Sequence, residues 1–224
     1  MRINQFVALA TGLSRRQADK LIINNTLIIN GQPAQIGQAV SQQDAVKLHG
    51  QTIKLPATSQ TIIFNKPAGY VVSRDGQGSP TIYDILPKNF HNLKPVGRLD
   101  KDSSGLLLLT NDGQLAQKLT HPRFAKQKIY EVELNKPLAP KDKTKLDRGI
   151  KVDNYLSRLR LSKIAISNSQ VDNRSWRVAV SQGRNRQIRR TFAALNYRVI
   201  KLHRTNFGDY ILSGLPSGQW KFVV

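Results

Sequence analysis

Helical spacing of apolar residues marks the start of the chain. Residues 3–10 place their apolar side chains on one face of a helix, and Gly12 follows as a stop signal. Ser14 and Gln17 stand three residues apart, the spacing of a capping box at the start of a second helix. The pattern predicts two short helices that pack through their apolar faces.

Strand-like segments complete this N-terminal part. Leu27-Ile28-Ile29 runs directly into Asn30-Gly31, a dipeptide typical of a tight hairpin turn, and a second short strand is expected at 45–48. The segment 54–60 is polar and contains a proline, as linkers between domains often do. We therefore expect one small domain over residues 1–56 and a larger one over residues 57–224.

The larger part mixes strand patterns with short helical patterns. The uniformly apolar run Leu106–Leu109 is bounded by turn residues on both sides and predicts a strand that is buried on both faces. Residues 129–134 alternate between apolar and polar, as in a half-buried strand. Further strands are expected at 61–64, 70–72, 159–166 and 176–180, and a helix at 114–119. This order predicts an α+β fold with a largely antiparallel mixed sheet flanked by helices.

The charge of the chain indicates a polyanionic partner. The 224 residues carry 35 Lys and Arg against 14 Asp and Glu, a formal net charge of +21. No segment has the length of a membrane-spanning helix, and the N-terminus lacks the apolar core of a signal peptide. The charge is also spread along the chain instead of being gathered on one amphipathic helix. These features favour a nucleic acid over a membrane surface.

Cysteine is absent, and the four histidines are scattered along the chain. Disulfides, thiolate catalysis and cysteine-based metal sites are therefore excluded. The absence of cysteine fits a cytoplasmic protein. We expect a protein of the cytoplasm that uses neither a metal nor a cofactor.

One carboxylate stands out by its position. Asp100 lies in the turn between Gly97 and Gly105, beside Arg98 and directly before the predicted buried strand. A side chain at the end of a rigid strand is well placed for a functional role. Ordinary turn formation explains an aspartate at this point equally well, because Asp-Ser-Ser-Gly is a common turn sequence.

A second basic segment follows near residue 185, with four arginines among the seven residues 184–190. Helical spacing from Asn185 onwards places an apolar face toward the core and puts Arg186, Arg189 and Arg190 together on another face. Gly183 precedes this helix and allows backbone N–H groups to approach an anion at its N-terminus. The segment is predicted to present its arginines to phosphate groups.

Tyr130 and Lys66 are each open to two interpretations. Tyr130 falls on the apolar face of its strand, so it is either a core tyrosine or, at the rim of a site, a ring that stacks on a base. Lys66 precedes a proline, and such a lysine more often ends a strand than takes part in a reaction.

Four motifs occur in order: Lys66-Pro67-x-Gly69, Gly97-Arg98-Leu99-Asp100 with Ser104-Gly105-Leu106-Leu107, Lys128-x-Tyr130, and Gly183-Arg184-Asn185-Arg186-Gln187-Ile188-Arg189-Arg190. Together they resemble the motifs of the RsuA/RluB-type ribosomal RNA pseudouridine synthases. The N-terminal part, from Arg2 through Ser14-Arg15-Arg16 and Asn30-Gly31 to Gly50, resembles the S4 RNA-binding domain that these enzymes also carry. The resemblance covers essentially the whole chain.

The resemblance implies a reaction and a set of roles. Uracil is detached from C1′ of its ribose, turned, and rejoined through C5. Asp100 is then the catalytic carboxylate, Tyr130 stacks on the target base, and Arg189 pairs with Asp100. The other residues expected to contact RNA are basic: Lys66, Arg98, Arg184, Arg186 and Arg190 in the larger domain, and Arg15, Arg16 and Lys20 in the smaller one.

The expected partner is ribosomal RNA or a pre-ribosomal particle, bound by a monomer. The stretch Lys145–Ile150 and the Arg-Asn-Arg-Gln form of the last motif favour 23S rRNA, with 16S rRNA as the alternative. A different class of function, a non-catalytic ribosome assembly factor, shares the basic surfaces but has no need of Asp100, Tyr130 and Arg189. A metal-dependent nuclease is disfavoured because clustered acidic or histidine ligands are missing.

Overall fold

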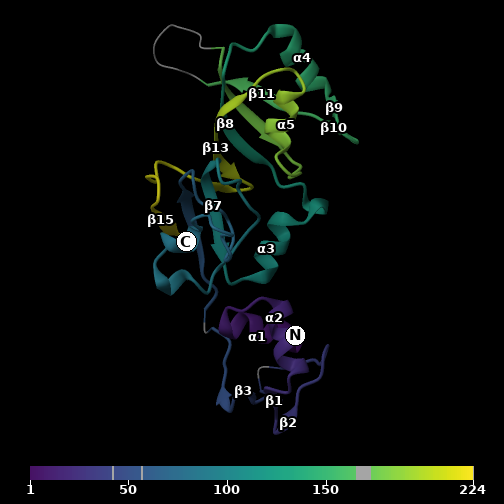
Figure 1. Ribbon diagram of the computed structural model, residues 1–224, viewed down its shortest axis with the longest axis vertical. Helices are drawn as coiled ribbons and strands as arrows, with labels where there is room; N and C mark the ends of the chain where they lie inside the picture. The colour runs from purple at the N-terminus through teal and green to yellow at the C-terminus, as the bar shows by residue number, and fades with distance from the viewer. Residues whose placement is uncertain (42, 57, 165–172, 224) are drawn as a thin grey trace. The chain divides into compact units, whose positions relative to one another are not determined.

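The computed structural model describes residues 1–41, 43–56, 58–164 and 173–223 (Figure 1). The chain divides into two compact units. The first comprises Met1–Thr61 with Leu86–Lys94 and Thr110–Asp112, and the second comprises Ile62–Ile85, Pro95–Leu109 and Gly113–Val224. None of the described helices is long and apolar enough to cross a membrane.

The two N-terminal helices form as their sequence pattern predicts. Helix α1 spans Ile3–Thr11 and ends at Gly12, whose positive φ of 77° suits a residue without a side chain. Helix α2 spans Arg15–Ile23 and begins with the complete capping box of Ser14 and Gln17. Their apolar faces join one core, in which Ile3, Val7 and Ala18 are fully buried.

A small antiparallel sheet completes the first unit. Its strands are β1 (Leu27–Ile29), β2 (Gln32–Pro33), β3 (Val46–Leu48) and β4 (Gln51–Thr52), in the order β2-β1-β3-β4. Asn30 and Gly31 both have positive φ, 50° and 85°, as the predicted hairpin turn requires. The hairpin and the flanking strands are confirmed.

A larger mixed sheet organises the second unit. Its strands are β5 (Thr61–Lys66), β6 (Lys94–Pro95), β7 (Ser104–Thr110), β8 (Lys128–Leu134), β11 (Arg160–Lys163), β12 (Ser175–Val180), β13 (Val199–Phe207), β14 (Tyr210–Ile211) and β15 (Trp220–Phe222). The main path runs β11-β12-β8-β13-β7-β5-β15. Neighbours β8 and β12, and β8 and β13, pair antiparallel, whereas β13 and β7 pair parallel. The mixed α+β architecture is confirmed.

Helices, a second hairpin and short turns connect the strands along the chain. The helices are α3 (Gly113–Thr120), α4 (Pro140–Arg148) and α5 (Gln187–Ala193), and a separate hairpin consists of β9 (Ile150–Val152) and β10 (Tyr155–Ser157). Three 3₁₀ turns lie at Ile82–Asp84, Lys88–Phe90 and Pro122–Phe124. In Figure 1, α4, α5 and the β9–β10 hairpin lie near the β11 end of the sheet, and α3 lies beside β7.

The strand β7 is the centre of the second core. Leu106, Leu107, Leu108 and Leu109 are all fully buried, which confirms the prediction of a strand covered on both faces. Two other strand predictions differ from the structure. Residues 70–72 contribute only a single bridge, between Val71 and Thr81, and β11 ends at Lys163. Of the predicted segment 159–166, residues 165 and 166 lie outside the described part of the chain.

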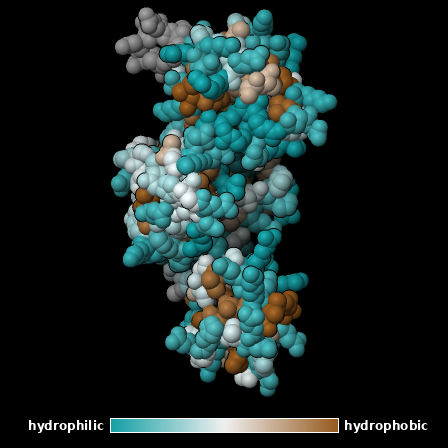
Figure 2. Space-filling view, viewed as in Figure 1, coloured by the Kyte–Doolittle hydropathy of each residue, from teal (hydrophilic) through white to brown (hydrophobic). Residues whose placement is uncertain are grey.

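The surface that faces the viewer in Figure 2 is mostly hydrophilic, with small separate apolar patches. This matches a chain with a formal net charge of +21. Many of the basic side chains, among them Arg15, Arg16, Arg98 and Arg184, are exposed to solvent and remain available to a polyanion.

Candidate active site

A cleft of about 930 Å³ lies within the second unit, over the face of strands β8, β12 and β13. Its walls come from segments that are distant in the sequence: the turn before β7, the end of α3 with the turn after it, and the loop that leads into α5. Among the residues that line this cleft are Arg98, Asp100, Lys128, Tyr130, Arg184, Arg186, Arg204 and Phe207.

Asp100 is presented to the cleft by a short turn in front of β7. Its side chain is 26% exposed, so the carboxylate is neither buried nor fully in solvent. Leu99 before it is buried, and the amide of Ser103 donates a hydrogen bond of 3.1 Å to the Asp100 carbonyl. The buried strand that follows fixes the position of this turn.

Lys66 supports the same turn through hydrogen bonds from its buried side chain. Its side chain is fully buried, and its Nζ donates hydrogen bonds to the carbonyls of Ser103 (2.7 Å), Pro67 (2.9 Å) and Asp100 (3.2 Å). Burial lowers the pKa of Lys66 to about 8, although the charges of Asp100 and Asp102 oppose this shift. Lys66 was predicted to contact RNA. This prediction is wrong, because its ammonium group is buried and donates its hydrogen bonds to main-chain carbonyls.

Arg186 makes the direct contact with the Asp100 carboxylate. Its Nη1 lies 3.6 Å from Oδ2 of Asp100 and 3.1 Å from Oδ1 of Asp102, and its Nη2 lies 3.4 Å from Oδ2 of Asp102. Arg186 is the residue before α5 and has a positive φ of 45°. This left-handed backbone places Arg186 outside the helix, and its guanidinium group reaches both carboxylates.

Arg189 holds the backbone of the turn. Its Nη2 donates to the Asp102 carbonyl at 2.9 Å and lies 3.4 Å from the Asp102 carboxylate, and its Nη1 donates to the Val199 carbonyl at 2.8 Å. The predicted pairing of Arg189 with Asp100 is therefore wrong, because Arg189 pairs with Asp102 and Arg186 pairs with Asp100. Burial alone would raise the pKa of Asp102, but the hydrogen bond from Arg186 and the charge of Arg189 lower it below its ordinary value.

The predicted arginine face of α5 is also different in the structure. The helix begins at Gln187 and not at Asn185, so Arg186 does not share a helical face with Arg189. Arg190 forms an ion pair with Asp153 of the β9–β10 turn and does not line the cleft. The helix has only seven residues, and it contributes to the site through its side chains. The apolar face is confirmed, since Ile188 and Phe192 are buried.

Tyr130 is a buried tyrosine of the sheet, 8% exposed, that also lines the cleft. Its register neighbours are Val178 on β12 and Arg204 on β13. Register neighbours in a sheet point to the same face, so Tyr130 and Arg204 lie side by side on the floor of the cleft.

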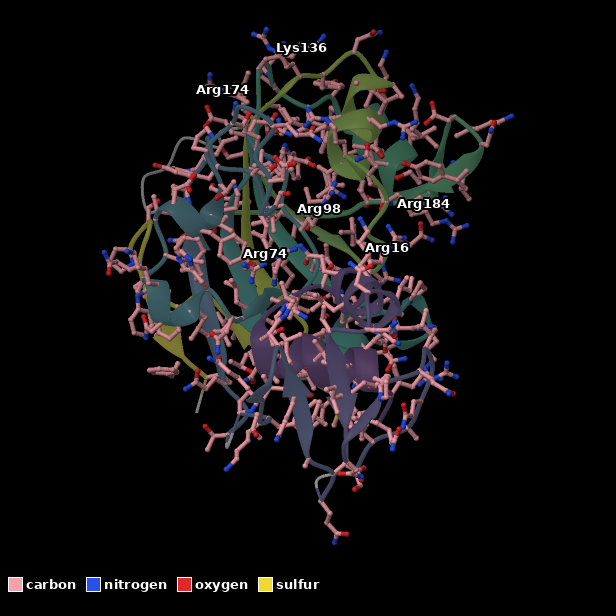
Figure 3. The ribbon with its side chains drawn as sticks, turned by 60° about the horizontal axis from the view of Figure 1, so that its bottom comes forward. Arg16, Arg74, Arg98, Lys136, Arg174 and Arg184 are labelled. Carbon is pink, nitrogen blue, oxygen red and sulfur yellow. The ribbon has the colours of Figure 1, made fainter. Side chains whose placement is uncertain are left out.

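Two other cations of the cleft, Arg98 and Arg184, are exposed. Arg98 comes from the turn before Asp100, and Arg184 comes from the loop between β12 and α5, where its guanidinium stacks on the Tyr155 ring at 4.3 Å. Figure 3 shows the two side chains projecting from these separate segments. In the first unit, Arg15, Arg16 and Lys20 are exposed on α2, as expected.

The family model for RNA pseudouridylate synthase matches residues 60–194 of this chain, a range that contains Asp100, Tyr130 and the arginines before and on α5. The chain belongs to the RNA pseudouridylate synthase family. This membership confirms the family that the motif order indicated and the predicted class of enzyme, an isomerase.

Similar proteins share this assignment over nearly their full length. The ribosomal small subunit pseudouridine synthase A of Haemophilus influenzae is 33% identical over 99% of this chain and 95% of its own length. The ribosomal large subunit pseudouridine synthase B of Bacillus subtilis is 32% identical over 97% of this chain and 90% of its own. A crystal structure of a pseudouridylate synthase superposes with a TM-score of 0.71 at 31% identity, covering 100% of this chain and 96% of that one.

Two further cations of this pseudouridine synthase lie in the cleft: Arg204, which the sequence motifs did not include, and Lys128, which they included without a role. Arg204 is only 1% exposed and lines the cleft, and Lys128 is half-buried beside it. Burial lowers the pKa of Lys128, and the charge of Arg204 lowers it further. The available signal was an arginine between Leu202 and Phe207, two inward-facing apolar residues of the same strand.

Proposed function

We propose that this chain converts a uridine of ribosomal RNA to pseudouridine, with Asp100 as the catalytic carboxylate. The observation that carries the proposal is the juxtaposition of Asp100, Tyr130 and several basic side chains in one cleft. The reaction is an isomerisation without net oxidation or reduction, so neither a redox cofactor nor a second substrate is required.

The Asp100 carboxylate suits the chemistry of the glycosidic bond. Breaking the bond between C1′ and N1 builds positive charge at C1′, and a carboxylate can stabilise this charge, attack C1′, or remove a proton from the ribose. Arg186 lies 3.6 Å from the Asp100 carboxylate and orients it toward the cleft. The second carboxylate, on Asp102, is bound to Arg186 and Arg189, so it is not available as a second acid.

The base must leave its RNA helix before the cleft can receive it. A flipped uridine requires a surface that replaces the lost stacking, and Tyr130 on the floor of the cleft offers an aromatic ring. Arg98 and Arg184 provide exposed guanidinium groups for phosphates. Tyr130 is therefore assigned to the base and these exposed arginines to the backbone.

The first unit is proposed to be an S4-type RNA-binding domain. Its exposed basic residues Arg15, Arg16 and Lys20 share the helix α2, and the unit has a hydrophobic core of its own. Equal RNA affinity of the full chain and of a chain lacking residues 1–56 would refute this assignment.

We assign the target to 23S rRNA on the sequence features given above, and 16S rRNA is the alternative. The relatives from Haemophilus influenzae and Bacillus subtilis are named for opposite ribosomal subunits, so their names do not favour either. A cytoplasmic monomer that acts on RNA or on a pre-ribosomal particle completes the proposal.

Tritium release tests the activity on whole transcripts, wherever the target uridine lies in them. The C5 hydrogen of uridine is lost in the reaction, so transcripts of 16S and 23S rRNA made with [5-³H]uridine release tritium into water. With the wild-type chain we expect release from one transcript. With Asp100→Ala the rate of release should fall by a factor of at least about 1000. RNA binding without release from either transcript would favour a non-catalytic assembly factor.

A further inference from the structure

Arg204 is a buried cation without an acidic partner. Its Nε donates to the Leu106 carbonyl at 2.7 Å, its Nη2 is buried without any hydrogen-bond partner, and no ion pair joins it to a carboxylate of the described residues. A buried charged donor without an acceptor destabilises the fold. Its position in the floor of a cleft indicates that a ligand supplies the missing acceptor.

The fold aims this cation at the cleft by an irregularity in β13. The register with β8 shifts between Arg204 and Asn206, a β-bulge that brings Arg204 and Phe207 to the same face of the sheet. The Arg204 guanidinium lies 5.0 Å from the centre of the Phe207 ring, and the Lys128 ammonium lies 4.9 Å from it. Arg204 and Lys128 therefore both contact the Phe207 ring, close to Tyr130. Two positive charges at one position favour the binding of an anionic group there.

The proposed reaction produces negative charge at this point. When the bond between C1′ and N1 breaks, its electron pair stays on the base, and the charge spreads over N1 and the carbonyl oxygens of uracil. A base stacked on Tyr130 has its edge within the reach of Arg204, the register neighbour of Tyr130. After rotation, C5 bonds to C1′, the C5 proton is lost and N1 is protonated, so the atoms balance.

We propose that Arg204 is a further catalytic residue, which donates hydrogen bonds to a carbonyl oxygen of the detached uracil and stabilises its negative charge, with Lys128 as the second cation. This inference rests on the proposed function. A phosphate group is the less suitable ligand, because Arg204 is only 1% exposed on the floor of the cleft whereas Arg98 and Arg184 are exposed.

The test is single-turnover tritium release from the transcript that proves to be the substrate. We expect Arg204→Met to lower the maximal rate about 100-fold and to change the enzyme concentration at half-maximal rate less than about threefold. Arg204→Lys should have a maximal rate at least about tenfold higher than that of Arg204→Met. Arg177→Met is the matched control, because Arg177 is an exposed arginine on β12 that does not line the cleft; it should keep the wild-type rate.

An unchanged maximal rate in Arg204→Met, or a loss confined to RNA affinity, would overturn the proposal. Equal rates of the Met and Lys variants, both with a lowered melting temperature, would show a purely structural role. If the variants do not fold, inhibition of the wild-type chain decides: 5-nitrouracil, which is ionised at neutral pH, should inhibit at least tenfold better than neutral uracil. Equal inhibition contradicts the inference, whereas a wild-type chain that releases no tritium contradicts the proposed function itself.

Discussion

Arg186 and Arg189 both contact the turn that carries Asp100 but support it in different ways. Arg186 is exposed and contacts the two carboxylates, whereas the Arg189 side chain is 12% exposed and donates to the carbonyls of Asp102 and Val199. Removal of Arg189 takes these two hydrogen-bond donors away from the carbonyls of Asp102 and Val199. We therefore expect Arg189→Met to lower the free energy of unfolding by about 2–3 kcal/mol, measured by urea denaturation.

Arg186→Met is expected to affect the reaction rate and not the stability. The side chain is 44% exposed, so the free energy of unfolding should change by less than about 1 kcal/mol. The tritium-release rate should nevertheless fall at least about tenfold, because Asp100 loses the cation closest to it. A large loss of stability in Arg186→Met, or none in Arg189→Met, would contradict this division of roles.

Lys66 gives the turn a dependence on pH. Its pKa of about 8 in the folded chain lies below the 10.5 of an ordinary lysine, because the ammonium is buried. The charged groups that face it are Asp100 and Asp102. As pH rises through about 8, the ammonium loses a proton and with it one hydrogen-bond donor to the turn, so the reaction rate should fall.

The stability should change in the opposite direction. Between pH 8 and 10.5 the unfolded chain binds more protons at Lys66 than the folded chain does. The contribution of Lys66 to the free energy of unfolding therefore increases as pH rises through this range. Rate and urea denaturation measured on the wild type and on Lys66→Met check both trends. The Met variant should lack both inflections, and the same inflections in that variant would exclude Lys66 as their source.

The sequence indicated Asp100 and Tyr130, which both line the cleft, but assigned the wrong arginine to Asp100. Uniform helical spacing from Asn185 puts Arg189 and Arg190 beside Arg186, yet Arg186 has a left-handed backbone that no spacing rule anticipates. The burial of Lys66 was equally hidden, because its acceptors are main-chain carbonyls, which every sequence possesses.

At the scale of elements, the parallel pair β7 and β13 fixes the floor of the cleft. Gly105 of β7 is the register partner of Arg204 and has a φ of 104°, a conformation that side chains rarely adopt. A methyl group at Gly105 would overlap the backbone of Arg204. Close approach of the two strands therefore depends on glycine at this position.

Gly105→Ala should lower the free energy of unfolding by about 3 kcal/mol, since it combines backbone strain with overlap between strands. Thermal and urea denaturation measure this loss. Gly113→Ala is the matched control, because no atom lies within 4 Å of its added methyl group and its φ is ordinary. Equal stabilities of the two variants would contradict the role of Gly105.

Elements with strong local signals were predictable, and elements set by tertiary contacts were not. The capping box of α2, the Asn30-Gly31 turn and the apolar run of β7 all appear as expected. Residues 70–72 have strand-like side chains but pair only through the bridge at Val71. The bulge in β13, which aims Arg204, depends on its register with β8 and leaves no mark in the sequence.

At the scale of the whole molecule, the net charge of +21 should make RNA binding steeply dependent on salt. The plot of log affinity against log salt concentration should lose about one to two units of slope in the double variant Arg15→Gln and Arg16→Gln. The control is Lys143→Gln with Lys145→Gln, because these lysines are already paired with Asp147 and Asp142. An equal loss of slope in both would contradict RNA contact by α2.

In the proposed function, Asp100 catalyses uridine isomerisation at a defined position of ribosomal RNA. The most direct test maps pseudouridine chemically across 16S and 23S rRNA from cells that lack this gene, complemented with the wild type or with Asp100→Ala. We expect one pseudouridine to be missing without the gene and to return only with the wild type. An unchanged map, or a site that Asp100→Ala restores as well as the wild type, would contradict catalysis by Asp100.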